Sequence, residues 1–470
     1  MTVTATFATS NRRRRRRKES LICSGVRKVR LLTSSPAVPS ALKPAPRVRL
    51  SRTLSLVFFL LLLCVFSSQA AQAPRWWKGN LHTHTLWSDG DDYPEMVVEW
   101  YKTNGYHFLA LSDHNILLEG EKWIASTNNR GGQKAFDKYL QRFGERWVEQ
   151  ATMQGTQMLR LRPLNEFRPL FEQPGRFLLM PSEEISDECR KVPIHVNATN
   201  LRDFIPPRGG SNILEVIQRN VDAVIEQRER TRRPMLPHVN HPNYCWAITA
   251  EDLMRVRGDH FFEVYNGHPE IHNEGDACHS GTERVWDILL TFRLAELRLG
   301  AMYALAVDDS HNYHALVPTN SNPGRGWIMV RAAKLTPEAL IAALEAGGFY
   351  ASSGVRLKDL RRERNRLSLE IDAEEGISYT TQFIGTRKGF NSSSEPGELP
   401  PETSRPTTRR YSSEIGMVLA EVKGSSAAYR VNGNELYVRA KVISSKLKDN
   451  AVVAGEREAA WIQPLIAPGQ

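Results

Sequence analysis

Short apolar runs alternate with helical patterns along the chain between residues 94 and 346. The apolar runs have the length and composition of buried strands, and they occupy residues 108–111, 176–180, 261–265 and 302–307. Helical patterns occupy residues 94–104, 213–228, 283–299 and 337–346, where Thr336 and Pro337 provide a helix start for the last one. Buried strands that alternate with helices are typical of a parallel α/β fold, which is the architecture that we predict.

Two further segments differ from this pattern. Residues 120–175 are polar, carry Trp and Arg, and are predicted to form a helical insertion over the functional site. After about residue 355, apolar and polar residues alternate with period two, as in 366–371 and 435–442, which predicts antiparallel strands. The predicted domains are a leader over 1–73, an α/β domain over 74–355 and a β-rich accessory domain over 356–470.

The leader has the pattern of an export signal. Arg12 to Arg17 form an unbroken basic run, and an apolar segment follows over residues 54–66. This segment is shorter than the ~20 residues that a bilayer span needs, and small residues follow it up to Ala70. We therefore expect a signal peptide and an exported protein, periplasmic or secreted, with an uncleaved membrane anchor as the alternative.

The positive charge of the chain is concentrated in this leader. The whole sequence has a formal charge of +10, but residues 1–73 hold 14 Lys and Arg and one acidic residue. Residues 74–470 hold 48 basic and 51 acidic residues, a net charge of −3. The main part of the protein therefore gives no electrostatic support for binding a nucleic-acid polymer. Membrane contact is expected only through the signal segment, and the sequence does not indicate an oligomeric state.

All 13 histidines lie between His82 and His314, and several stand with carboxylates where a predicted strand ends. The ends of strands are where α/β barrels carry their chemistry. In an extended segment residues i and i+2 point to the same face, so His82 and His84 can converge on one ion. The candidate ligands are six histidines and three carboxylates: His82, His84, Asp89, His114, Glu184, His195, His241, Asp309 and His311. One four- to six-coordinate ion cannot use nine ligands, which predicts two or three divalent ions that share carboxylates.

The motifs occur in an order that resembles a known family. His-x-His, Ser-Asp-Gly, Asp-His-Asn, Glu-Ile-Ser, His, His-Pro and Asp-x-His follow one another over residues 77–315, as in the PHP (polymerase and histidinol phosphatase) superfamily. The β-rich tail, at residues 435–440 and 460–464, is similar to the secreted metallohydrolase branch that includes carbaryl-hydrolase-like proteins. The resemblance implies a distorted (β/α)7 TIM-like barrel with a trinuclear metal cluster, followed by a C-terminal antiparallel β domain.

The resemblance also implies how the ligands are shared. His82 and His84 would hold one ion with Glu184 and Asp309, and Glu184 would bridge to a second ion held by His195 and His241. The third ion would be held by Asp89, His114 and His311. The position directly before Ile-Ser favours Glu184 over Glu183 as the ligand. Sites that mix His and carboxylate accept Zn, Mn or Fe, so the metal is left open.

Neighbouring residues have more ordinary interpretations. Asp113 is expected to orient His114 or to cap the next turn, and Asp308 and His238 are expected to be structural. Asn240 and Asn266 could bond to the substrate or to the backbone. We expect His272, His279 and His314 to face solvent, and Cys245 and Trp246 to pack.

The function expected from this set is hydrolysis of a phosphate monoester or diester. Two cations ~3.5–4 Å apart lower the pKa of a bridging water, which gives a metal-bound hydroxide at neutral pH as the nucleophile. Asp309 or His268 would then handle protons as a catalytic residue. The substrate would be a small phosphorylated or ester compound. Carboxylic ester or carbamate hydrolysis on the same metals is one alternative, and a secreted, non-catalytic binding module is another.

Overall fold

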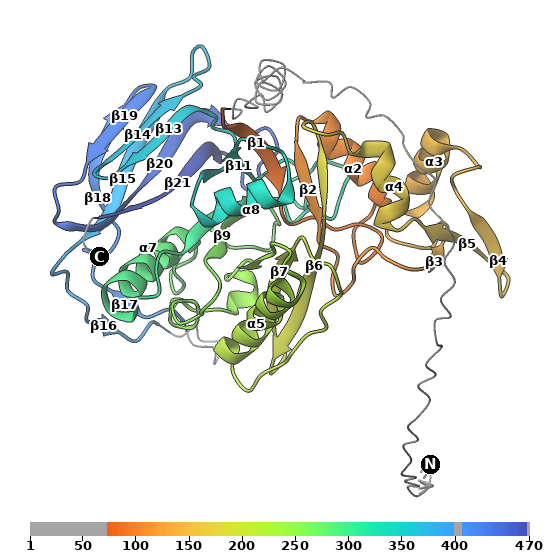
Figure 1. Cartoon of the computed structure of the whole chain (residues 1–470), viewed down its shortest axis with the longest axis horizontal. Helices are drawn as coiled ribbons and strands as arrows, with labels where there is room; N and C mark the ends of the chain where they lie inside the picture. Colours follow the sequence, from red (N-terminus) through yellow and green to blue (C-terminus); the bar gives the residue numbers. More distant parts are fainter. Residues whose placement is uncertain (1–72, 399–406, 468–470) are drawn as a thin grey trace, which may run out of the picture. The chain divides into compact units, whose positions relative to one another are not determined.

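The computed structural model describes residues 73–398 and 407–467 (Figure 1). The predicted signal peptide lies outside the described residues. The helices are α2 (Pro94–Thr103), α3 (Gly132–Phe143), α4 (Leu164–Phe171), α5 (Ile213–Thr231), α6 (Ala250–Leu253), α7 (Thr282–Phe292) and α8 (Pro337–Glu345), with a 3₁₀ turn (Tyr244–Trp246) and a π-helical turn (Arg293–Leu297). Among these helices, none is both long and apolar enough to span a bilayer.

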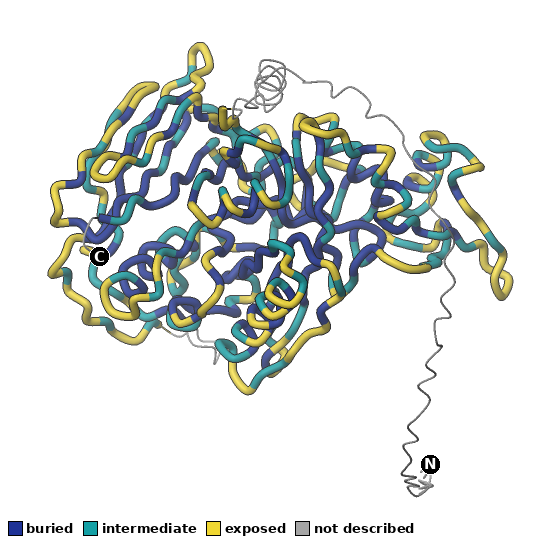
Figure 2. The backbone as a smooth tube through the Cα atoms, viewed as in Figure 1, coloured by how far each residue is buried: buried dark blue, intermediate teal, exposed yellow. Residues whose placement is uncertain are grey.

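The strands of the first half are β1 (Arg75–Asn80), β2 (Phe108–Leu111), β3 (Lys122–Ala125), β4 (Gln150–Met153), β5 (Thr156–Leu161), β6 (Leu178–Cys189), β7 (Val192–Thr199), β8 (Leu236–Val239), β9 (Phe261–Asn266), β10 (Tyr303–Val307), β11 (Trp327–Ala332) and β12 (Phe349–Ser352). Those of the C-terminal part are β13 (Leu357–Glu363), β14 (Arg366–Ile371), β15 (Tyr379–Arg387), β16 (Ser394–Glu395), β17 (Arg410–Tyr411), β18 (Met417–Lys423), β19 (Ser426–Arg430), β20 (Glu435–Leu447) and β21 (Arg457–Ile466). Burial is concentrated along the long strands, and exposure along the outer turns (Figure 2).

The predicted strands and helices of the α/β part are present. Each of the four predicted apolar runs contains or overlaps a strand, namely β2, β6, β9 and β10. Helix α5 begins after Asn212, whose side chain accepts a hydrogen bond from the Glu215 N–H, and α8 begins after Thr336, which caps the Ala339 N–H in the same way. The mixed α/β class is therefore confirmed.

The sheet is mixed and not purely parallel. One 13-stranded sheet has the order β10-β9-β8-β7-β6-β2-β1-β11-β12-β21-β20-β15-β18. Strands β1, β2 and β6 run parallel, as do β8, β9 and β10, but β7 is antiparallel to both of its neighbours. The prediction of parallel strands throughout was wrong at β7, because a two-residue turn replaces the expected helical crossover. Arg190 and Lys191 make this turn with φ of 52° and 68°, a conformation that their residue types do not signal.

The segments that follow β1 and β10 meet beyond the ends of these two strands. Thr83, after β1, forms a parallel bridge with Ser310, after β10. The His84 N–H donates to the Ser310 carbonyl at 3.0 Å, and the Asp309 N–H donates to the His82 carbonyl at 3.1 Å. Backbone hydrogen bonds therefore join the segments that carry two of the candidate ligand motifs.

The segment 120–175 is not simply helical. It contains α3 and α4, as predicted, but also a three-stranded antiparallel sheet in the order β3-β5-β4. Strands β4 and β5 are joined at Gln154 and Gly155, which both have positive φ, as a tight hairpin requires. In the second half of β5 the buried Leu159 and Leu161 flank the partly buried Arg160, an alternation too short to outweigh the helical prediction.

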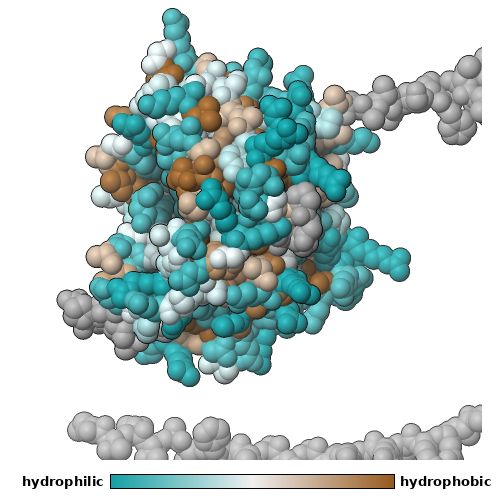
Figure 3. All heavy atoms as spheres, turned by 90° about the vertical axis from the view of Figure 1, so that its left-hand side faces the viewer, coloured by the Kyte–Doolittle hydropathy of each residue, from teal (hydrophilic) through white to brown (hydrophobic). Residues whose placement is uncertain are grey.

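The C-terminal part is antiparallel, as the period-two pattern predicts. Strand β12 pairs with β21, so the strands of this part extend the large sheet across residue 355, and a second sheet has the order β13-β14-β19. The face of the molecule seen in Figure 3 is mainly hydrophilic, with scattered hydrophobic side chains. The boundary of an independent accessory domain stays a prediction.

A buried ion pair joins this β-rich part to α7. The Arg439 guanidinium, on β20, donates from Nε and from one terminal nitrogen to the two carboxylate oxygens of Asp287, both at 2.7 Å. Tyr437 Oη donates to the same carboxylate at 2.8 Å, and the guanidinium lies over the Trp286 ring. Both charged side chains are buried, so each depends on the other to offset its lost hydration.

We expect Asp287→Asn to lower the free energy of unfolding by about 3–5 kcal/mol, because it removes the doubly hydrogen-bonded partner of the buried Arg439 charge and leaves only a longer contact, of 3.5 Å, with Glu283. Urea unfolding followed by circular dichroism measures this. Asp372→Asn is the matched control, because Asp372 pairs with Arg356 on the exposed surface and such pairs contribute less than about 1 kcal/mol. Equal losses in the two variants would contradict a stabilising role for the buried pair.

Candidate metal centre

The nine predicted ligands lie together, although they come from distant parts of the sequence. The loop after β1 carries three of them, the loop after β2 and the strands β6 and β7 carry one each, and the loops after β8 and β10 carry the rest. Their nitrogen and oxygen atoms form overlapping groups in which all ligand atoms lie within 4.8 Å of one another. The strand-end pattern therefore predicted which side chains gather, and their role as metal ligands stays a prediction.

Glu184 lies at the centre of the cluster and is fully buried. Its Oε1 is 2.9 Å from His195 Nδ1, 3.4 Å from His241 Nε2 and 3.5 Å from His82 Nε2. Its Oε2 is 2.7 Å from His114 Nδ1 and 3.4 Å from His84 Nε2. One carboxylate thus contacts five imidazoles, which is the arrangement expected of a ligand that bridges ions.

Glu183, the neighbouring acid, points the other way because successive side chains of a strand alternate. Its Oε1 accepts a hydrogen bond from the Ile205 N–H at 2.8 Å, and it contacts none of the candidate ligands. Burial raises the pKa of Glu183 to about 8, although the Ile205 N–H opposes this. The choice of Glu184 over Glu183 as the residue that faces the cluster agrees with the structure.

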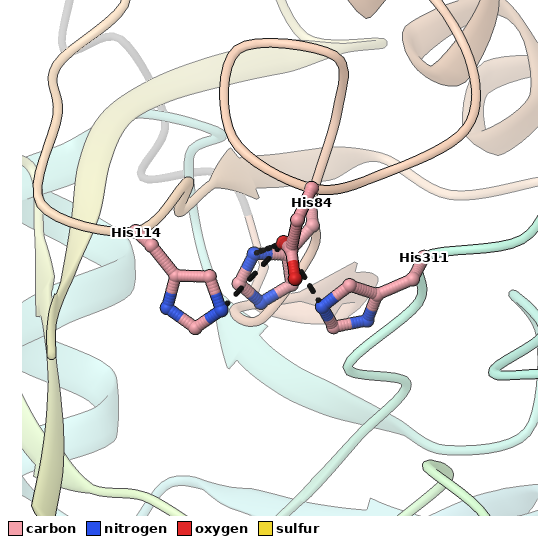
Figure 4. Close-up of side chains that lie close together, drawn as sticks. His84, His114 and His311 are labelled. Atoms are coloured by element: carbon pink, nitrogen blue, oxygen red, sulfur yellow. Dashed lines mark ion pairs between the residues drawn. The ribbon is translucent and has the colours of Figure 1, made fainter. Parts of the chain in front are cut away.

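A second group is formed by Asp89 and three histidines, which Figure 4 shows pointing toward one another from separate segments. Asp89 Oδ1 is 3.3 Å from His311 Nε2, and 3.6 Å from both His114 Nε2 and His84 Nδ1. The His84 and His311 rings stack with centroids 4.0 Å apart. The predicted third set is thus together, and His84 lies beside it as well as beside Glu184.

Asp309 completes the cluster from the loop after β10. Its Oδ1 is 3.2 Å from the Nε2 atoms of both His82 and His84. His241 groups with His82 and Asp309, whereas His195 groups with His114 and Glu184. His195 and His241 both face Glu184 Oε1, and their rings have centroids 5.1 Å apart, so the sharing of one ion by these two residues stays a prediction.

The polar atoms of the cluster fit a metal site better than a hydrogen-bonded network. Four buried atoms lack a partner in hydrogen-bonding geometry: His82 Nε2, His84 Nε2, His195 Nδ1 and Glu184 Oε2. This holds although Glu184 Oε2 lies 2.7 Å from His114 Nδ1 and His195 Nδ1 lies 2.9 Å from Glu184 Oε1. Buried polar atoms in proteins nearly always have well-aligned hydrogen bonds, so several that lack them in one cluster need an explanation. Imidazole nitrogens and carboxylate oxygens are ligands for Zn, Mn and Fe, so divalent cations between these atoms would satisfy them.

Supporting hydrogen bonds fix which nitrogen of each ring faces the cluster. His82 Nδ1 donates to Glu263 Oε1 at 2.7 Å, and His311 Nδ1 donates to the Asp309 carbonyl at 2.9 Å. Both rings therefore present Nε2 without a proton when neutral, as a metal-ligating imidazole requires. The sequence interpretation missed Glu263 as part of the site. A lone acid inside the apolar strand β9 was the available signal, because a buried charge needs partners.

The two asparagines act on the carboxylates. Asn240 Nδ2 donates to Glu184 Oε1 at 2.7 Å, and Asn266 Nδ2 donates to Glu263 Oε2 at 2.8 Å and to Asp309 Oδ2 at 3.1 Å. Asn240 also accepts a hydrogen bond from the Asn197 backbone N–H, so the predicted bond to the backbone is present. Both amides hold the orientation of the acidic groups.

Other neighbours are placed as follows. Asp113 accepts hydrogen bonds from Thr85 and Ser88, so it holds the loop after β1 and does not orient His114. Asp308 is structural, as predicted, and accepts from the backbone of the segment before β11. His238 is buried and bonds to Glu263, also as predicted.

Two predictions of solvent-facing histidines were wrong. His279 stacks on Trp246 at 3.9 Å between ring centroids, and its Nδ1 is held by Asp276, so only 9% of its side chain is exposed. His314 Nε2 donates to the Asp91 carbonyl at 2.9 Å. His272 is exposed, as predicted, and covers the other face of Trp246.

Charge and burial set the protonation of the cluster. The carboxylates of Asp309, Glu263 and Glu184 outweigh burial and raise the pKa of His82 well above its usual range. Burial and the nearby rings of His311 and His114 lower the pKa of His84 to about 3. The imidazoles hold the pKa values of Glu184 and Asp309 well below their usual range, despite burial. Both carboxylates are therefore ionised at neutral pH.

The cluster opens into a cavity of about 290 Å³. Its wall contains seven of the candidate ligands and six other residues: Arg130, Tyr244, His268, Glu270, Ile271 and Asn312. The backbone N–H of His268 donates to Asn266 Oδ1, and the ring Nδ1 of His268 accepts a hydrogen bond from the Glu270 backbone N–H at 3.2 Å. The neutral His268 ring therefore carries its proton on Nε2.

We expect Glu184→Gln to lose most bound metal, because an amide cannot supply the negative charge that offsets the cations. Elemental analysis of the purified protein after dialysis against Mn²⁺ or Zn²⁺ measures this. Glu183→Gln is the matched control and should keep its metal, since Glu183 faces away from the cluster. Retention of full metal content by Glu184→Gln would overturn the central position of this carboxylate.

Glu183→Gln should also change how stability depends on pH. The pKa of Glu183 rises from an ordinary 4.5 to about 8 in the folded state, so the folded protein holds this proton over a range in which the unfolded chain has lost it. Wild-type stability should therefore decline as pH rises from 5 to 8, by up to about 1.4 kcal/mol per unit of pKa difference. Urea unfolding at pH 5 and pH 8 should show a smaller decline in the variant. Parallel declines would contradict an uncharged, buried Glu183.

The sequence matches no known family model and no curated protein. Three solved structures are similar at 14% identity. A two-domain protein from Bacteroides vulgatus, described as containing a predicted PHP-like metal-dependent phosphoesterase, covers 83% of this chain and 95% of its own with a TM-score of 0.33. A protein from Bifidobacterium adolescentis, described as a metal-dependent phosphoesterase, covers 51% and 89% with a TM-score of 0.22. An amidohydrolase from Chromobacterium violaceum with bound sulfate and no metal covers 50% and 88% with a TM-score of 0.22. Similarities this low assign neither a family nor an activity to the chain.

Proposed function

We propose that this protein is a metal-dependent hydrolase of phosphate esters and a member of the PHP superfamily, in its secreted carbaryl-hydrolase-like branch. The observation that carries the proposal is the set of buried imidazole and carboxylate atoms around Glu184 that lack a partner in hydrogen-bonding geometry, at the base of an open cavity. A purely structural cluster would satisfy these atoms with well-aligned hydrogen bonds. An exported location, periplasmic or secreted, is part of the same proposal.

The fold supports this proposal through its strand arrangement. Seven strands, β1, β2, β6, β7, β8, β9 and β10, are neighbours in the large sheet. The bridge between Thr83 and Ser310 links the ends of this series. We interpret it as a distorted (β/α)7 TIM-like barrel with β7 reversed, which closes at the same end as the cluster.

We infer two or three divalent ions, Zn, Mn or Fe, held by the nine predicted ligands. When bound, such cations supply Lewis acidity and lower the pKa of water, which suits hydrolysis at neutral pH. The chain positions its ligands for this in advance. Glu263 keeps the His82 proton on Nδ1, and Asn240 and Asn266 hold Glu184 and Asp309 in place.

His268 is better suited than Asp309 to deliver a proton. Asp309 is ionised, with a pKa far below its usual range, and its Oδ1 faces His82 and His84. It therefore acts as an acceptor or ligand. His268 lies in the cavity wall, where burial lowers its pKa, and the neutral ring has its proton on Nε2. From there the neutral ring can donate a hydrogen bond to the leaving oxygen of an ester, and the protonated imidazolium form can donate a proton to it.

The cavity indicates a small substrate. Its volume of about 290 Å³ is near the lower end of the range for small-molecule sites. The charge of −3 over residues 74–470 provides no field that would attract a nucleic-acid polymer. A small phosphorylated compound fits both observations.

We expect His82→Ala and His311→Ala to lose bound metal and to lower phosphoester hydrolysis at least about 100-fold, because a lost ligand should cost no less than a lost supporting residue. The assay compares 4-nitrophenyl phosphate, bis-4-nitrophenyl phosphate and naphthyl carbamate, with circular dichroism to verify the fold. His260→Ala is the control, since His260 is exposed and lies outside the cavity. Turnover of the carbamate without either phosphate would favour an ester or carbamate hydrolase. No turnover of any substrate by the metal-loaded protein would favour a binding module.

A further inference from the structure

The insertion between β2 and β6 contacts the two loops that carry Asp89 and His311. Lys122 Nζ donates to the Trp87 carbonyl, and Lys138 Nζ donates to Asp92 at 2.6 Å. Lys134 Nζ donates to the His314 carbonyl at 3.2 Å. These contacts fix the insertion against the mouth of the cavity, and one further basic residue of the insertion, Arg130, reaches the cavity itself.

A compact turn positions Arg130. Asn129 Oδ1 accepts hydrogen bonds from the Gly131 N–H at 2.9 Å and the Gly132 N–H at 3.1 Å. Gly132 has a φ of 62°, which most other residues avoid. At Gly131 a Cβ atom would lie 2.5 Å from the Asp91 carbonyl oxygen, so only glycine allows this close approach. The turn therefore packs against the loop that carries Asp89 and restricts the backbone position of Arg130.

The Arg130 side chain is only partly engaged by the protein. One terminal nitrogen donates to the Asp89 carbonyl at 2.8 Å and is 3.7 Å from Asp89 Oδ2. Among the described residues no other side chain pairs with it, and 62% of the side chain is exposed. Its remaining N–H groups are free to bind a ligand in the cavity.

Arg130 is also the one Lys or Arg in the described wall of this cavity. Four acidic residues line the same cavity: Asp89, Glu184, Glu270 and Asp309. Divalent cations would offset the negative charges of the three predicted carboxylate ligands, Asp89, Glu184 and Asp309, but Glu270 lies outside that set. An anionic substrate therefore needs a further cation away from the metals, and a guanidinium binds phosphate oxygens in pairs through its planar fork.

We propose that Arg130 binds the phosphoryl group of the substrate and selects phosphate monoesters. This inference rests on the proposed function and extends it to a substrate class. A monoester has three non-bridging oxygens, so cations on one side and Arg130 on the other can bind it together. A diester has two such oxygens and carries a second substituent. Glu270 disfavours a second anionic group close to the site, which also argues against a polymer.

The test uses the full-length, metal-loaded protein with Arg130→Met and Arg130→Lys. Arg146→Met is the matched control, since Arg146 is an exposed arginine of the same insertion that does not line the cavity. Calorimetry measures the binding of inorganic phosphate, and steady-state kinetics compare 4-nitrophenyl phosphate with bis-4-nitrophenyl phosphate. Elemental analysis measures the bound metal.

We expect Arg130→Met to weaken phosphate binding and to raise KM for the monoester about 10- to 100-fold, from the loss of charge-assisted hydrogen bonds. Metal content should be unchanged, the diester should be affected less, and Arg130→Lys should recover part of the loss. Unchanged phosphate binding in Arg130→Met would overturn the inference. So would loss of bound metal with equal losses for both substrates, since Arg130 would then only support Asp89. Failure of the wild type to hydrolyse any phosphoester would instead reject the proposed function, and calorimetry would still test Arg130.

Discussion

The buried carboxylate of Glu184, in contact with five imidazoles, is the constraint on which the rest of this arrangement depends. Removing an ionised carboxylate from water costs several kcal/mol unless charge and hydrogen bonds replace the lost hydration. Among the described residues, one hydrogen bond from an uncharged group reaches this carboxylate, and it comes from the Asn240 amide. The remaining compensation comes from imidazoles on other segments, whose nitrogens lie 2.7 to 3.5 Å away. The fold must therefore bring those segments together for Glu184 to stay ionised.

Strand ends provide this convergence, and a further set of polar groups provides its orientation. Glu263, in the middle of β9, bonds to His82, to His238 and to the His241 backbone N–H. It therefore connects three residues that approach the cluster from two different loops and a strand. This network commits His82 Nδ1 to Glu263 and leaves His82 Nε2 facing inward. The supporting carboxylate is thus as necessary to the geometry as the residues that face the cavity.

Much of the site could be predicted from the sequence because its signals are local. A histidine or acid directly after an apolar run is visible in the sequence, and the topology of an α/β sheet brings such ends together. Glu263 was missed because it stands inside a strand and its partners are distant in the sequence. The reversal of β7 was missed because it depends on Arg190 and Lys191 adopting positive φ, which neither residue type indicates. The sheet of the insertion was missed because short strands on an exposed hairpin carry little hydrophobic signal.

The two halves of the cluster are supported in different ways. Glu184 and His195 lie on long, paired strands of the main sheet, where register fixes their positions. Asp89 and His311 lie on loops, and the insertion holds these loops through side chains such as Lys134 and through the close approach of Gly131. The geometry of the first pair is thus a property of the core fold, whereas that of the second depends on a segment outside the main sheet. Changes in the insertion can therefore alter the mouth of the cavity and its outer ligand group while the central carboxylate stays in place.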